Sequence, residues 1–182
     1  MNTYIALLKG INVGGHKKVP MADLRELLTK SGLKNVKTYI QSGNIIFQSS
    51  NKNVQNIEAI IQNAMTSHFG FEVSVLVRTR AHLQSIFNHC PFTDEKKIKS
   101  YFTMLHDTPE EALVKIASEK VYEGEAYHII KDCIYFYCEK GYGQAKFNMN
   151  FFERKLKTIG TARNYNTMVK LLSMSLENEK GD

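Results

Sequence analysis

The spacing of apolar side chains changes along the first 80 residues in an order that few folds accommodate. Short apolar or alternating runs are typical of strands, and apolar residues three and four apart are typical of helices. In chain order the segments are a strand, a helix, two strands, a helix and a strand, at residues 4–8, 21–33, 36–41, 44–48, 54–69 and 71–77. This order predicts a ferredoxin-like unit, in which two helices pack on one face of an antiparallel sheet.

The same order recurs after a polar, charged segment at residues 93–99. The predicted elements of this half lie at residues 100–105, 108–118, 126–130, 133–138, 147–159 and 161–164, followed by a helix that reaches about residue 176. Thr108-Pro109-Glu110-Glu111 has the form of a capping box and predicts a helix start there. We therefore expect an α+β protein of two ferredoxin-like halves, residues 1–92 and 93–182, with antiparallel sheets and an extra C-terminal helix.

The positive charge is concentrated in the first third of the chain. Residues 1–57 contain eight Lys or Arg and two Asp or Glu, a net charge of +6, which equals the net charge of the whole protein. The other residues carry 16 basic and 16 acidic side chains. A basic, acid-poor surface attracts phosphates and nucleic acid. The alternative is an ordinary solvated face with exposed lysines.

A glycine-rich, basic segment, Lys9-Gly10-Ile11-Asn12-Val13-Gly14-Gly15-His16-Lys17-Lys18, joins the first strand to the first helix. Such a loop can present backbone N–H groups to an anion. It is not a P-loop, because His16 follows the second glycine where Lys is required. The alternative is a turn whose glycines simply permit positive φ.

The chain shows no pattern of a catalytic or metal centre. Its six histidines are scattered, its three cysteines form no C-x-x-C pair, and Ser42 is not in a nucleophile elbow. The polar residues of the loops are instead Lys, Arg and carboxamides, which donate hydrogen bonds without adding negative charge. The candidate ligand-binding residues are Lys9, Gly10, Asn12, Gly14, Gly15, Lys17, Gln41, Ser42, Asn44, Arg163, Asn164 and Asn166. Asn and Ser also favour turns and helix caps, which is the structural alternative for each of them.

Several of these segments resemble a bacterial family. They are residues 6–15 (ALLKGINVGG), 19–21 (VPM), 38–44 (TYIQSGN) and 161–167 (TARNYNT), and the likeness extends from about residue 3 to about residue 175. They are similar to the signature segments of the domain of unknown function 1697. The resemblance implies a cytoplasmic α+β protein with two ferredoxin-like halves and brings no activity with it. Ala145 replaces a hydroxyl residue that is common in the family, which weakens a phosphate role for the loop at residues 143–146. Tyr165 stands where the family usually has Trp.

These observations favour a cytoplasmic protein that binds a phosphate-bearing ligand, a nucleotide or nucleic acid, through its basic first half. The rivals are a metal-free small-molecule enzyme with its site between the halves, and an interaction module without ligand chemistry. Base stacking on the sheet is a further option, since Tyr4, Tyr39 and Phe47 are available on its strands. We also expect Arg163 to reach an anion held near Asn12 and Gly14. The sequence predicts no membrane contact, because no apolar run approaches the length of a bilayer span, and leaves the cofactor, the reaction and the oligomeric state open.

Overall fold

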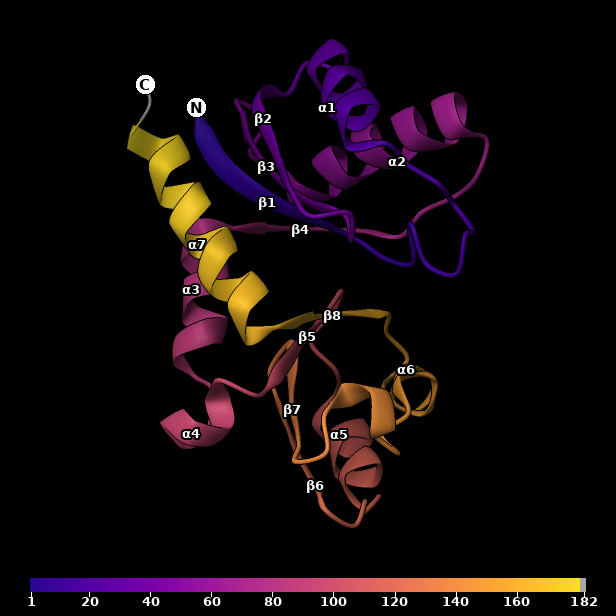
Figure 1. Cartoon of the computed structure of the whole chain (residues 1–182), viewed down its shortest axis with the longest axis vertical. Coiled ribbons are helices and arrows are strands. Elements are labelled where there is room, and N and C mark those ends of the chain that lie inside the picture. The colour runs from indigo at the N-terminus through magenta and orange to yellow at the C-terminus, as the bar shows by residue number, and fades with distance from the viewer. Residues whose placement is uncertain (181–182) are drawn as a thin grey trace. The chain divides into compact units, whose positions relative to one another are not determined.

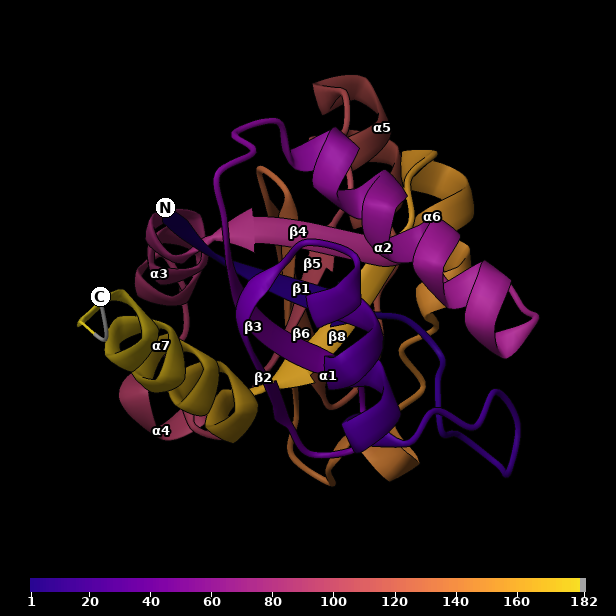
Figure 2. The same cartoon turned by 90° about the horizontal axis from the view of Figure 1, so that it is seen from above.

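The computed structural model describes residues 1–180, which form two compact units (Figures 1 and 2). The first unit contains Met1–Ser85 and the chain from Lys170 onward, and the second contains Ile86–Val169. The boundaries fall within two helices, α3 (Arg80–Asn88) and α7 (Tyr165–Lys180). None of the described helices combines the length and the hydropathy that a bilayer-spanning segment needs.

The first unit has the predicted ferredoxin-like topology. Its elements are β1 (Asn2–Leu8), α1 (Met21–Lys30), β2 (Lys34–Tyr39), β3 (Asn44–Ser49), α2 (Val54–Phe69) and β4 (Val75–Thr79). The strands form one sheet in the order β2-β3-β1-β4, and every neighbouring pair is antiparallel. Both helices lie on the same face of this sheet (Figure 2).

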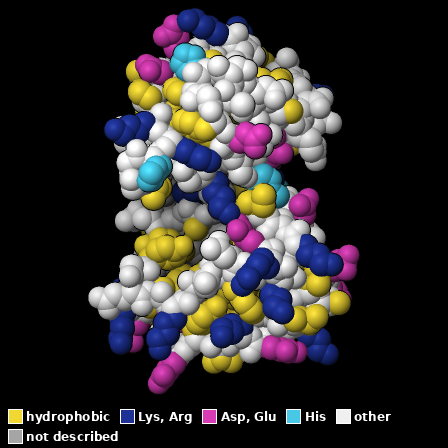
Figure 3. Space-filling view, turned by 90° about the vertical axis from the view of Figure 1, so that its right-hand side faces the viewer, with side chains coloured by type: hydrophobic (Ala, Val, Ile, Leu, Met, Phe, Trp, Pro, Cys, Tyr) yellow, Lys and Arg dark blue, Asp and Glu magenta, His cyan; other side chains and the backbone are white. Residues whose placement is uncertain are grey.

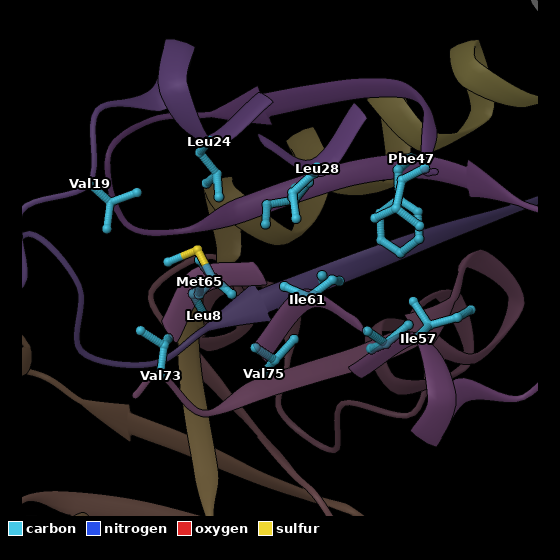
Figure 4. Close-up of a cluster of buried hydrophobic side chains, with 14 of the residues drawn as sticks. Leu8, Val19, Leu24, Leu28, Phe47, Ile57, Ile61, Met65, Val73 and Val75 are labelled. Atoms are coloured by element: carbon cyan, nitrogen blue, oxygen red, sulfur yellow. The ribbon is translucent and has the colours of Figure 1, made fainter. Parts of the chain in front are cut away.

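The core of the first unit lies between this face and the two helices (Figure 4). Because side chains alternate along a strand, Tyr4, Ala6 and Leu8 of β1 all point toward the helices. Leu24 and Leu28 of α1 are fully buried against them. The other labelled members of the cluster are Val19, Phe47, Ile57, Ile61, Met65, Val73 and Val75. The two helical stripes expected from the sequence are therefore core faces.

The opposite face of this sheet is covered in part by the last turns of α7. The side-chain amide of Gln48 donates to the carbonyl of Asn178 at 3.0 Å, and Asn35 donates to Gln48 at 2.5 Å. Glu179 of α7 also forms an ion pair with Arg80, the first residue of α3, at 3.9 Å. The C-terminal helix thus belongs to the first unit at its far end, although the chain enters it from the second.

The second unit repeats the same topology. Its elements are α4 (Asp94–Lys97), β5 (Tyr101–Leu105), α5 (Glu111–Ser118), β6 (Glu125–Ile130), β7 (Cys133–Cys138), a 3-10 turn η1 (Tyr142–Gln144), α6 (Met149–Leu156) and β8 (Gly160–Asn164). The sheet order is β6-β7-β5-β8, again antiparallel throughout. Leu105, Ile134 and Phe152 are the centre of its core, with Tyr127 and Phe147 packed against them. The prediction of two ferredoxin-like halves is confirmed.

Some predicted boundaries are wrong. The helix expected from Thr108 begins at Glu111, and Glu110, which precedes it, makes no capping bond through its side chain. The strand expected at residues 71–77 begins only at Val75, because residues 70–74 form a loop at the end of the sheet. The polar segment 93–99, predicted without regular structure, holds one helical turn, α4.

Candidate functional site

The glycine-rich segment folds into a small hairpin that ends in two glycines. Val13 and His16 pair as an isolated antiparallel bridge, and the His16 N–H donates to the Val13 carbonyl at 3.0 Å. Gly14 and Gly15 between them have φ values of +58° and +78°, as a type I′ turn requires. Both glycines are exposed, and within residues 1–180 their N–H groups make no hydrogen bond. The turn explains the glycines, and it leaves two backbone donors open to solvent.

Asn12 fixes the base of this hairpin and joins it to a second loop. Its side-chain amide donates to the Val19 carbonyl at 3.0 Å and to the Gln41 carbonyl at 2.8 Å, and its side-chain oxygen accepts from the Val19 N–H at 2.8 Å. The φ of Asn12 is +54°, a conformation that Asn adopts more readily than most residues. The hydrogen bonds of the Asn12 side chain therefore link residues 12–19 to residues 40–43.

The second loop is the turn between β2 and β3, and it packs closely against the first strand. The Asn44 side chain is fully buried and donates to the Tyr39 carbonyl and to the Ser42 hydroxyl. The Leu8 N–H donates to the Gly43 carbonyl at 2.8 Å. A Cβ on Gly43 would lie 2.6 Å from the Leu8 Cβ, so only glycine fits. Ser42 and Asn44 thus have structural roles in this turn.

The lysines of the first loop have different surroundings. The Lys9 N–H donates to the Ser74 carbonyl at 3.0 Å, which ties the end of β1 to the loop before β4. The Lys17 ammonium donates to the Glu72 carbonyl at 2.7 Å and lies 5.8 Å from the centre of the Phe71 ring. Lys18 is exposed beside the hairpin. Lys17 is therefore held in place, whereas the Lys18 side chain extends into solvent.

Residues 9–18 and 40–43 together form what we call the loop surface. It contains Lys9, Lys17 and Lys18 and no Asp or Glu. It brings together nine of the predicted ligand-binding residues, namely Lys9, Gly10, Asn12, Gly14, Gly15, Lys17, Gln41, Ser42 and, directly behind the turn, Asn44. In the view of Figure 3, Lys and Arg side chains are interspersed with polar, acidic and His side chains and form no continuous basic patch.

Two residues of the loop surface are apolar and exposed, which the sequence did not predict. Val13 and Ile40 are 66% and 51% exposed. Ile40 has a φ of +48°, which is an outlier for a β-branched residue and costs about 1–3 kcal/mol. No pattern in the sequence signals this conformation.

The remaining candidates, Arg163, Asn164 and Asn166, lie in the second unit. Arg163 is buried on β8 and donates to the Thr161 hydroxyl at 2.9 Å and the Ala162 carbonyl at 2.8 Å. Burial lowers the pKa of its guanidinium to about 10. The side-chain oxygen of Asn164 accepts from the Thr167 N–H at the start of α7, as in a helix cap, and Asn166 is exposed. The expected meeting of Arg163 with an anion near Asn12 and Gly14 stays a prediction.

Two of the three aromatic side chains considered for base stacking, Tyr4 and Phe47, are not available on an open sheet face. Tyr4 and Phe47 stack on each other at 5.8 Å between centroids inside the first core, where they are 2% and 0% exposed. Base stacking needs aromatic rings on the face away from the helices. The suggestion that these two rings bind bases is therefore wrong.

The three cysteines are free, and Cys133 and Cys138 are buried. Burial in an apolar environment raises the pKa of the Cys133 thiol well above its ordinary value, so this thiol stays protonated and a poor nucleophile. Residues 1–180 bring together no group of three His, Cys, Asp or Glu side chains with the geometry to hold a metal ion.

Comparison with known proteins places the chain in a family. The family model described as "Protein of unknown function (DUF1697)" matches residues 1–135. Among solved structures, the chain is similar to the conserved bacterial protein SP0830 from Streptococcus pneumoniae, with 26% identity and a TM-score of 0.77 over 96% of this chain and 98% of that one. No curated protein matches the sequence. The family match covers well over half of the chain, including the hairpin and the β2–β3 turn, and the chain therefore belongs to the DUF1697 family of proteins of unknown function.

Proposed function

We propose that the protein binds a phosphate-bearing ligand, a nucleotide or nucleic acid, at the loop surface of its first unit. The observation that carries this proposal is the pair of exposed N–H donors of Gly14 and Gly15, beside Lys18 and on a hairpin that Asn12 fixes. Backbone N–H groups and lysine ammonium groups are the donors that phosphate oxygens accept from. Because the hairpin is already anchored, binding does not have to order it first.

The number of cations limits the size of the ligand contact. The loop surface holds three lysines, so it neutralises at most about three phosphates. Counterion release then predicts that the logarithm of the binding constant for DNA falls with the logarithm of salt concentration with a slope no steeper than about −3. Three lysines suit a nucleotide or a short stretch of nucleic-acid backbone equally well. A slope steeper than about −3 would instead indicate contact with a longer stretch of nucleic acid.

A panel of ATP, inorganic phosphate and a short single-stranded oligonucleotide tests the proposal by thermal shift. A ligand at about 100 times its dissociation constant adds about 2.7 kcal/mol to the free energy of unfolding, which raises the Tm by about 5–10 °C in a protein of this size. The double variant Lys17→Glu/Lys18→Glu should weaken binding at least about tenfold, because it replaces two attractive charges with repulsive ones. Since Lys17 also anchors the hairpin to Glu72, the single variant Lys18→Glu isolates the effect of charge.

The matched control is Lys115→Glu/Lys120→Glu, which changes the net charge equally on exposed positions of the second unit. It should leave binding within about twofold of the parent protein, because neither lysine belongs to the loop surface. Equal loss in the two double variants, or no Tm shift with any ligand of the panel, would refute the proposal.

We also propose a cytoplasmic location. The support is chemical, since three free thiols persist most readily in a reducing compartment. Cell fractionation followed by immunoblotting tests it, and recovery of the protein outside the cytoplasmic fraction would refute it.

A further inference from the structure

The last turns of α7 contain a buried amide group that the chain itself does not satisfy. Asn178 is only 3% exposed, and its backbone carbonyl accepts from the Gln48 side chain. Within residues 1–180, however, the side-chain nitrogen of Asn178 has no hydrogen-bond partner. Because buried polar groups are almost always hydrogen-bonded, this nitrogen points to a partner from outside the chain.

Asn178 lines a groove of about 220 Å³ between α7 and the edge strand β2 of the first unit. Its other lining residues are Asn35, Val36, Lys37 and Glu177. Asn35 and Val36 lie where the pairing of β2 with β3 is irregular, and such an irregularity bends a strand and changes the direction of its side chains. The groove has room for about seven water molecules of about 30 Å³ each. It is smaller than the sites of about 300–1,000 Å³ that bind drug-sized molecules, and it therefore suits a small metabolite.

The lining contains one charge of each sign, on Lys37 and Glu177. A simple anion is attracted by Lys37 but repelled by Glu177, and a simple cation meets the reverse. A molecule with both a carboxylate and an ammonium group finds an opposite charge for each of them. The two carboxamides divide in the same way. The Asn178 nitrogen can only donate, whereas Asn35, whose nitrogen already donates to Gln48, offers its side-chain oxygen as an acceptor.

We propose that this groove binds a free α-amino acid. The Lys37 ammonium and the Asn178 amide bind its carboxylate. The Glu177 carboxylate and the Asn35 oxygen bind its ammonium group, and Val36 is the apolar part of the lining. Hydrogen bonds between charged groups are stronger than neutral ones, which gives a zwitterion the advantage over a neutral molecule of the same size. The groove contains no residue of the loop surface.

NMR titrations of the full chain with L-alanine, propionate and L-alaninamide test this proposal. The three probes have similar shapes, but propionate lacks the ammonium group and L-alaninamide lacks the carboxylate. L-alanine should shift the side-chain amide signals of Asn178 and the backbone signals of residues 35–37. It should bind at least about tenfold more tightly than either analogue, because each analogue loses one charged contact and meets one like charge.

Variants at the two exposed charges should change this selectivity without disturbing the core. Glu177→Gln should weaken L-alanine binding about threefold to tenfold and bring propionate to a similar affinity, since the repulsion of an anion is removed. Lys37→Gln should do the same for L-alaninamide. The matched control is Lys34→Gln, which removes a charge from an exposed position of β2 outside the groove. It should leave the three affinities within about twofold of those of the parent protein.

The absence of a shift at Asn178 with saturating L-alanine would overturn the proposal. Equal affinities of the parent protein for the three probes would also overturn it, as would a selectivity that neither Glu177→Gln nor Lys37→Gln changes. These outcomes are independent of phosphate binding at the loop surface, because none of the variants alters a residue of that surface.

Discussion

Gly15 and Gly43 share a φ of +78° but differ in their surroundings. A Cβ on Gly15 would meet nothing within 4 Å, whereas a Cβ on Gly43 would lie 2.6 Å from the Leu8 Cβ and 3.1 Å from the Ile11 side chain. Gly15→Ala should therefore lower the free energy of unfolding by about 1–2 kcal/mol, the cost of placing alanine in the left-handed region. Gly43→Ala adds steric overlap with a buried strand, and we expect about 2–5 kcal/mol in total.

Chemical denaturation of the two variants measures this difference. The change in the free energy of unfolding should be clearly larger for Gly43→Ala, although the backbone conformation is the same. Equal losses would mean that the β2–β3 turn is not packed against β1 in the way that places the loop surface.

The residues of the loop surface also show where sequence reasoning succeeds and where it stops. The sequence located the glycine-rich loop and the turn at Ser42-Gly43, because glycine marks positions of positive φ. It did not show that the side chain of Asn12 bonds three backbone groups, two of them on Val19 and one on Gln41, since the contact to Gln41 spans 29 positions of the chain. Nor did it predict the positive φ of Ile40, which contradicts the preference of a β-branched residue.

At the scale of elements, the same kind of hydrogen bond between a helix and an edge strand occurs in both units. A glutamate of the second helix of each unit, Glu58 on α2 and Glu153 on α6, accepts a hydrogen bond from an N–H of the edge strand that follows. Each covers an edge that would otherwise be open to pairing. The two contacts fall at different places along their strands, since Val77 is the third residue of β4 and Gly160 is the first of β8.

Glu58→Ala should lower the free energy of unfolding by about 1–3 kcal/mol, because the N–H of the buried Val77 loses its acceptor. Glu58→Gln keeps a carbonyl acceptor and should lose about half as much, since the bond is then neutral. Denaturant titration compares the two. A Gln variant as unstable as the Ala variant would contradict a role for the hydrogen bond.

The order of the elements was predictable because each change between strand and helix spacing is local in the sequence. The sheet order followed from the ferredoxin-like pattern and is confirmed in both units.

The direction in which the Tyr4 and Phe47 side chains point was not predictable in the same way. Aromatic residues on central strands suit either face of a sheet, and these two rings fill the space beneath α1 and α2. The start of β4 was misplaced because residues 71–74 alternate like a strand but lie outside the ladder that β4 forms with β1.

At the scale of the whole molecule, the charge asymmetry coincides with the candidate site. The first 57 residues contain the entire net charge of +6 and also the loop surface, whose own residues include no acid. The second unit has the same fold but no excess of positive charge. A ligand that bound the ferredoxin-like fold irrespective of charge would therefore bind both units. A ligand that recognises charge and backbone donors should therefore act on the first unit only.

Amide-resolved NMR during a titration with ATP tests this claim most directly. We predict that the largest chemical-shift changes occur at the Gly14 and Gly15 amides, with smaller changes at residues 16–18 and 40–43, and that Lys18→Glu reduces the affinity. The amides of the second unit should stay unchanged. An absence of shifts at the loop surface at saturating ATP, or shifts centred on the second unit, would contradict the account.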